Sequence, residues 1–178
     1  MRLGRKERSY PEDTGATEDD ASRRPARPGG TRLRSEGGPR TKKTVYNPTT
    51  LAAPVGHFDR AVRFGDWLFV SGTSALTNVS GPIEERRLVE GIEAQTHETL
   101  DNIEKVLEAA GGSLADVYEV RIVLKKRADF AVVDRILRER IPEKGFIAHG
   151  YEGVLLHPEM ELEIEVNAYL GPLDAETR

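Results

Sequence analysis

The fold is decided by residues 99–126, TLDNIEKVLEAAGGSLADVYEVRIVLKK, where the spacing of the apolar side chains changes once. Up to Ala110, apolar and small residues recur every three or four positions, as on one face of an α-helix. After Asp116, apolar and polar residues alternate, which is the pattern of a half-buried strand. Between them, Gly111 is available for the left-handed conformation that ends helices. The stretch therefore predicts a helix followed by a strand.

The segments before this stretch predict two strands and the start of the helix. Residues 57–72, HFDRAVRFGDWLFVSG, predict two short strands around the turn FGDW. In the second strand Leu68 and Val70 share one face, and Trp67, Phe69 and Ser71 share the other. The helix is expected from about Val89 to Ala110. Its buried stripe is expected to comprise Ile92, Thr96, Thr99, Leu100, Ile103, Val106, Leu107 and Ala110.

The segments after it predict a second helix and two closing strands. Residues 128–142, ADFAVVDRILRERIP, predict a helix with Asp129 as its N-cap and Pro142 as its stop. Its stripe is expected to comprise Phe130, Val133, Ile136, Leu137 and Ile141. Residues 151–156, YEGVLL, and 161–170, ELEIEVNAYL, predict strands joined by the tight connection HPEM. In the strand between the helices, Tyr118, Val120, Ile122 and Leu124 are expected on one face.

The predicted order is β-β-α-β-α-β-β. Two helices on one face of a mostly antiparallel sheet make an α+β domain. The other sheet face, rich in Val, Ile and Leu, would need a cover, and self-association is the simplest source of one.

The charge distribution predicts a boundary near residue 44. Residues 1–44 carry 12 Lys and Arg against 7 Asp and Glu, and residues 45–178 carry 14 against 23. The first segment has almost no large apolar side chains and cannot offset the entropy of ordering its backbone. We expect residues 1–44 to be a flexible basic arm and residues 45–178 to be a single domain. Such an arm can contact nucleic acid or an acidic partner, or remain a solvated tail.

Composition argues against several classes of protein. No stretch approaches 18 apolar residues, so we expect no membrane span. The chain has no cysteine, which excludes disulfides and thiolate chemistry and is compatible with the expected cytoplasmic location. The histidines lack metal-ligand spacing, so no metal is expected. The arm has no apolar h-region of a secretory signal.

Three motifs resemble the Rid family, also called RidA or YjgF. They are residues 70–76, VSGTSAL, residues 95–134, QTHETLDNIEKVLEAAGGSLADVYEVRIVLKKRADFAVVD, and residues 162–170, LEIEVNAYL. The similarity runs from about Val55 to Leu170. It implies a chorismate-mutase-like α+β fold and a homotrimer with ligand clefts between subunits. It also implies hydrolysis of reactive 2-imino and enamine acids to 2-keto acids and ammonia, with no metal or organic cofactor.

The resemblance assigns a changed ligand pocket. The arginine that holds the substrate carboxylate in the family's deaminases is replaced by His149, and the cysteine two positions later by Tyr151. The catalytic glutamate falls on Glu163. Three further pocket positions, expected to bind substrate, are occupied by Phe58, Thr73 and Asp134, where the family has tyrosine, glutamine and asparagine.

This set of residues predicts acid–base chemistry on an unusual ligand. Histidine lacks the planar fork with which arginine binds a carboxylate. A cleft holding His149, Asp134 and Glu163 would favour a neutral or cationic amine, imine or enamine over a small anionic imino acid. Glu163 could position water or take a proton while His149 protonates a leaving amine. The alternatives remain that His149 and Asp134 are surface residues, and that Glu161, Glu163 and Glu165 are only the solvated face of a strand.

Two functions compete at this point. The first is an enzyme that hydrolyses or isomerises an imine or enamine of a specialised pathway. The second is a small-molecule-binding or regulatory trimer without chemistry. RNA cleavage has also been associated with the family name, but the excess of acidic residues in 45–178 would repel phosphates, so nucleic acid is not expected as a partner.

Overall fold

The structure is a computed structural model that describes residues 41–77 and 82–173. Its elements follow the predicted order, with one unpredicted strand at the start. The strands are β1 (Lys43–Tyr46), β2 (Ala61–Phe64), β3 (Trp67–Thr73), β4 (Val117–Leu124), β5 (Ile147–Glu152) and β6 (Leu162–Tyr169). The helices are α1 (Ile92–Ala109) and α2 (Phe130–Arg140). Residues 1–40 of the predicted arm lie outside the described residues, and its last two residues, Lys43 and Thr44, begin β1.

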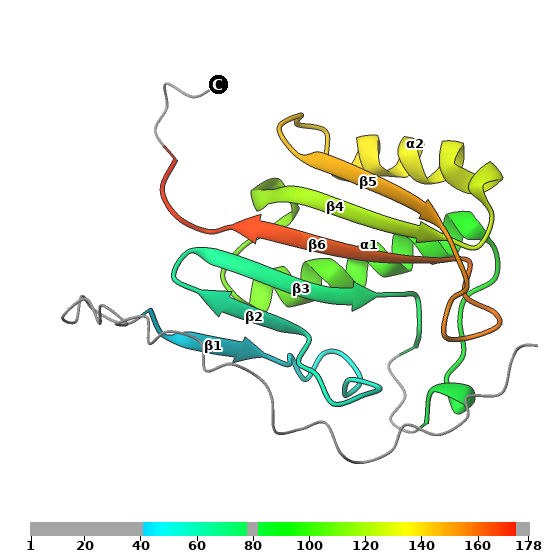
Figure 1. The fold of residues 1–178 in the computed structure, drawn as a ribbon, viewed down its shortest axis with the longest axis horizontal. Helices are drawn as coiled ribbons and strands as arrows, with labels where there is room; N and C mark the ends of the chain where they lie inside the picture. The colour runs from blue at the N-terminus through cyan, green and yellow to red at the C-terminus, as the bar shows by residue number, and fades with distance from the viewer. Residues whose placement is uncertain (1–40, 78–81, 174–178) are drawn as a thin grey trace, which may run out of the picture. The chain divides into compact units, whose positions relative to one another are not determined.

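Within the described residues the strands form one mixed sheet in the order β1-β2-β3-β6-β4-β5. All neighbours are antiparallel except β4 and β5, which are parallel because α2 carries the chain across between them. Both helices lie on one face of the sheet (Figure 1). The predicted α+β class is therefore confirmed. No helix in residues 41–77 and 82–173 has the length and apolar character needed to cross a bilayer.

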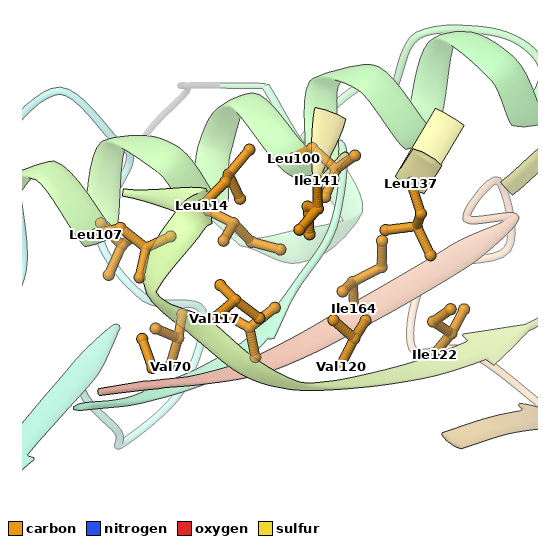
Figure 2. Packing of buried hydrophobic residues seen from close by; sticks show 14 of the residues in the cluster. Val70, Leu100, Leu107, Leu114, Val117, Val120, Ile122, Leu137, Ile141 and Ile164 are labelled. Atoms are coloured by element: carbon orange, nitrogen blue, oxygen red, sulfur yellow. The ribbon is translucent and has the colours of Figure 1, made fainter. Parts of the chain in front are cut away.

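The core lies between α1, α2 and the helix-facing side of the sheet (Figure 2). Leu68 and Val70 are buried there, whereas Trp67 and Phe69 on the alternate positions of β3 are exposed, so the two sets lie on opposite faces as predicted. The residues that fill this layer include Leu100, Ile103 and Leu107 of α1, Val133, Ile136 and Leu137 of α2, and Leu162, Ile164 and Val166 of β6. Burial of each such side chain contributes roughly 1.5–3 kcal/mol, so this layer holds the fold together.

The C-terminal end of α1 has the predicted structure, and the N-terminal end of α2 does not. Gly111 has φ +84° after α1, and the amide of Gly112 donates to the carbonyl of Leu107 at 2.9 Å. Asp129 lies at the start of α2, but its side chain makes no capping hydrogen bond. Phe130 was expected in the buried stripe, and it is 48% exposed. Phe130 is thus outside the buried stripe of α2, which comprises Val133, Ile136 and Leu137.

Two strands differ from their predicted pattern. An irregularity between Val117 and Glu119 in the pairing with β6 shifts Tyr118 away from the face of Val120. The ring of Tyr118 instead lies 5.2 Å from that of Trp67 on the open face. The strand predicted at 151–156 runs over Ile147–Glu152, because β4, its pairing partner, ends at Leu124 opposite Glu152. His149 is therefore inside a strand, whereas the predicted strand began two residues after it.

Candidate active site

A pocket lies near the end of the sheet where β3 ends and β6 begins. Its volume is about 50 Å³, room for a few non-hydrogen atoms. The walls come from the segment between β1 and β2, the end of β3, the 3₁₀ turn Ile83–Glu85 and the residue after it, α1, the β5–β6 loop and β6. Its charged lining residues are Glu163, Arg60 and Arg86. Phe58 also lines the pocket, so two of the six site residues expected from the sequence meet here.

Glu163 lies on β6 between the buried Leu162 and Ile164, so the strand alternation points its side chain to the open face. Burial, and then the negative charge of Glu165, raise the pKa of Glu163 above its ordinary value. No hydrogen bond to this carboxylate is found among residues 41–77 and 82–173. A half-buried carboxylate with a raised pKa and no protein partner is suited to exchanging a proton with a bound molecule.

The Glu163 carboxylate lies directly over Gly72 of β3. A Cβ atom added at Gly72 would stand 2.6 Å from Oε1 of Glu163, closer than real Cβ contacts allow. Glycine at this position therefore leaves the space that the carboxylate occupies. This explains the glycine of the motif SG in residues 71–72: a side chain at position 72 would overlap the Glu163 carboxylate.

Two arginines line the same pocket and were not selected from the sequence. Nη2 of Arg60 donates to the carbonyl of Ala52 at 2.8 Å, and Nη2 of Arg86 donates to that of Ala53 at 2.9 Å. Burial, and then the charge of Arg86, lower the pKa of Arg60. Sequence reasoning missed them because both lie in irregular segments, where side-chain direction cannot be read from periodicity.

His149 lies outside this pocket, on the open face of β5. Its Nε2 is 3.6 Å from Oε1 of Glu119, an ion pair only when the imidazole is protonated. It is 45% exposed by side chain, whereas Glu119 is 10% exposed. Parallel pairing of β4 with β5, in which His149 is opposite Arg121, brings this pair together. Within one chain the partner of His149 is thus Glu119 and not Glu163.

Glu119 is the centre of a polar network on the open face. Nδ2 of Asn167 donates to its Oε2 at 2.7 Å, and Nε of Arg121 donates to its Oε1 at 3.0 Å. Arg121 also pairs with Glu165 at 2.8 Å. The Asn167 hydrogen bond first, and then those of Arg121 and its charge, outweigh burial and lower the pKa of Glu119. We call Glu119, Arg121, Asn167 and Glu165 the Glu119 network. Its members come from the adjacent strands β4 and β6. The sequence pattern did not reveal the register in which these two strands pair.

The other three expected site residues are not among the pocket-lining residues of a single chain. Thr73 is buried, pairs with the helix-facing Ile164 and donates its hydroxyl to the carbonyl of Ser71 at 2.8 Å. Asp134 accepts hydrogen bonds from Arg138 at 2.7 and 3.0 Å on α2. Tyr151 is 57% exposed on β5. Asp134 therefore adds no negative charge to the pocket of its own chain, whose charged lining groups are two guanidinium groups and one carboxyl group.

Among the described residues, no group of three or more His, Cys, Asp and Glu side chains could hold a metal ion. Taken together, the mixed sheet, its two helices and the pocket that carries Glu163 define an α+β protein with a polar pocket at one end of the sheet.

Comparison with known proteins places the chain within a family. The family model described as Endoribonuclease L-PSP matches residues 49–170. The chain belongs to this family, which includes the RutC and RidA (YjgF) proteins. A RutC family protein of Pyrococcus horikoshii is 35% identical over 128 residues, which cover 71% of this chain and 98% of that protein.

Two further relatives carry the RidA name. The chloroplastic Reactive Intermediate Deaminase A of Arabidopsis thaliana is 28% identical over 129 residues, which cover 72% of this chain and 67% of that protein. The crystal structure of RidA from an Antarctic Psychrobacter bacterium superposes with a TM-score of 0.64 at 28% identity, covering 71% of this chain and 98% of that one. The resemblance expected from the three sequence motifs is thus confirmed.

Proposed function

We propose that this protein is an enzyme that hydrolyses or isomerises an imine or enamine group of a small metabolite, without a metal or organic cofactor. The observation that carries the proposal is the place of Glu163. Its carboxylate lines the pocket, has a raised pKa and lies over Gly72. Membership of a family that includes a protein named Reactive Intermediate Deaminase A supports the reaction class.

The chemistry needs one water and a group that moves protons. In hydrolysis, Glu163 takes a proton from water, whose oxygen forms a bond to the imine carbon. Glu163 passes this proton to the nitrogen, and the new hydroxyl group gives up the second water proton to it as the carbon–nitrogen bond breaks. Ammonia leaves, and a carbonyl product remains. Isomerisation uses the same carboxyl group to move a proton between carbon and nitrogen. Such proton transfer contributes roughly 10²–10⁴-fold in rate.

The full cleft is proposed to form between subunits of a homotrimer. His149 and Tyr151 are exposed on β5, away from the pocket of their own chain. The open sheet face also exposes Phe64, Trp67 and Phe69, which a second copy would cover. In this arrangement His149 and Tyr151 of one subunit border a cleft that contains Phe58 and Glu163 of its neighbour. Because His149 replaces the family's arginine, simple 2-imino acids are not the proposed substrates.

The test compares Glu163→Gln with Glu159→Gln. Glu159 is exposed in the β5–β6 loop and does not line the pocket, so its substitution removes the same charge outside the pocket. Ammonia release would be measured on a panel of imines and enamines generated in situ, including 2-iminopropanoate. Glu163→Gln should lower turnover of the accepted substrate at least 100-fold, and Glu159→Gln should leave it within twofold. Binding without any turnover in the unaltered protein would support the alternative, a small-molecule-binding or regulatory trimer.

A further inference from the structure

Two guanidinium groups, those of Arg60 and Arg86, line the same pocket as Glu163. We propose that Arg60 and Arg86 form a subsite for an oxyanion, the carboxylate or phosphate of a small metabolite. This inference rests on the proposed function, because it assumes that the substrate of the proposed enzyme binds in this pocket. It adds where such a substrate would place an anionic group: on Arg60 and Arg86, and not on the residue at position 149.

Arg86 is the more deeply buried of the two arginines. It follows the 3₁₀ turn Ile83–Glu85 and is 4% exposed, and its hydrogen bond to the carbonyl of Ala53 fixes the guanidinium. A buried cation is unfavourable unless charge or hydrogen bonds compensate for its lost hydration. Its side chain also lines the pocket, so a bound anion would lie within the field of its positive charge.

Arg60 lacks full compensation within the described part of the chain. Its Nη2 donates to the carbonyl of Ala52, but its Nε is buried and has no hydrogen-bond partner there. It makes no ion pair with a described residue, and the charge of Arg86 acts on it unfavourably. An oxyanion bound on the pocket side of the Arg60 guanidinium would offset the unfavourable interaction between its charge and that of Arg86.

The subsite differs from the position that the family arginine would occupy. Arg60 directly precedes β2 and Arg86 follows the 3₁₀ turn, whereas His149 lies on β5. An anion bound by the two arginines would therefore approach from another wall of the pocket. Glu163 is the third charged lining group. A ligand could place its oxyanion on the arginines and its carbon–nitrogen bond near Glu163. Its oxyanion and the Glu163 carboxylate would then be kept apart.

The competing explanation is structural, because both arginines also hold the carbonyls of residues 52 and 53. The experiment therefore measures anion binding and not turnover. Sodium phosphate and sodium acetate would each be titrated into the full chain at constant ionic strength set with chloride. Binding would be followed by calorimetry and by the Nε–H resonances of arginine in ¹H–¹⁵N spectra. The variants are Arg60→Gln, Arg60→Lys and Arg86→Lys, with Arg87→Gln as control, an exposed arginine outside the pocket lining.

We expect saturable binding of at least one anion, with a shift of the resonance that disappears in Arg60→Lys. Arg60→Gln should weaken binding at least tenfold, Arg86→Lys at least fivefold, and Arg87→Gln less than twofold. The tighter of the two anions identifies the ligand's group. If Arg60→Gln does not fold, Arg60→Lys decides, because it keeps the charge and loses the fork. Absence of saturable binding, or unchanged binding in both Arg60 variants, would overturn the subsite.

Failure of the subsite can be separated from failure of the enzyme proposal. Glu163→Gln should retain anion binding while losing turnover. Anion binding with no turnover of any imine or enamine would contradict the proposed function and leave the subsite standing. Turnover of neutral imines with no anion binding would contradict the subsite and leave the proposed function standing.

Discussion

The raised pKa of Glu163 makes a prediction about stability. The folded protein holds this proton to higher pH than the unfolded chain, so its contribution to stability falls as pH rises from about 4.5 through the folded pKa. Glutamine does not titrate. Relative to the unaltered protein, Glu163→Gln should therefore gain stability across this window and keep the gain at pH 7. Urea unfolding at several pH values and one protein concentration measures the difference.

The control for that series is Glu159→Gln, whose difference from the unaltered protein should stay within about 0.5 kcal/mol at every pH, as for most surface changes. A Glu163→Gln difference that does not change with pH would show that the folded environment does not favour the protonated form. Loss of activity together with a gain of stability would mark Glu163 as a group kept for function.

Gly72 offers a way to move Glu163 without changing it. In Gly72→Ala the new Cβ would displace the carboxylate by repulsion at Oε1. Misplacement of a reacting group by about 1 Å can lower rates about 100-fold. We expect kcat to fall roughly 10- to 100-fold, with an unfolding midpoint close to that of the unaltered protein.

The check for this mechanism is the double variant Gly72→Ala with Glu163→Gln. If the glycine acts through the carboxylate, the double variant should be no slower than Glu163→Gln alone. Additive losses would mean that Gly72 affects the pocket by another route.

Among the elements, α1 supports the pocket through Gln95. The side chain is 2% exposed and donates to the carbonyls of Val89 at 3.0 Å and Glu159 at 2.9 Å. Its Oε1 accepts from the amide of Glu161 at 2.9 Å. These bonds tie the β5–β6 loop, which contributes Leu156 and Met160 to the pocket, to the helix.

Gln95→Leu should remove three partly buried hydrogen bonds and leave their backbone groups without this side-chain partner. The expected loss is roughly 2–4 kcal/mol of unfolding free energy, measured by denaturant titration. Hydrogen exchange should rise at the amide of Glu161. Glu108→Ala, an exposed change near the end of the same helix, should alter stability by less than about 0.5 kcal/mol. Equal effects of the two variants would rule out a special role for Gln95.

The same elements show what could be predicted from the sequence. The change of period after Ala110 identified α1 and β4, because burial of one face imposes that period on the residues. The strand β1 was missed, because its four residues follow a basic run and carry little apolar signal. The Glu119–His149 pair was missed because it depends on the parallel register of β4 and β5. Arg60 and Arg86 meet only through tertiary contacts between irregular segments, which no local pattern encodes.

For the molecule as a whole, the two sides of the sheet are not equivalent. One side is covered by α1 and α2 (Figure 1). The other exposes aromatic rings around the Glu119 network. We expect a homotrimer in solution, held through this open face. Phe69→Asp, at a side chain 42% exposed on that face, should shift the mass measured by light scattering from trimer to monomer.

Phe130→Asp is the matched control for this change. Phe130 is 48% exposed, nearly the same as Phe69, but it lies on α2 in the helical layer. The trimer should persist in Phe130→Asp. A stable monomer at micromolar concentration in the unaltered chain would contradict the assembly, and dissociation by both variants would show that the open face has no special part in it.

The close approach of Gly72 and Glu163 also limits how this pocket can change during evolution. Any side chain at position 72 competes for the volume of the carboxylate, so a single substitution there disturbs position 163 at once. A lineage that shortens residue 163 first removes this conflict and can then accept a larger residue at 72. The two positions are therefore expected to covary among relatives, with the order of the two changes fixed. Ancestral reconstruction of a branch that lacks the glutamate would reveal that order.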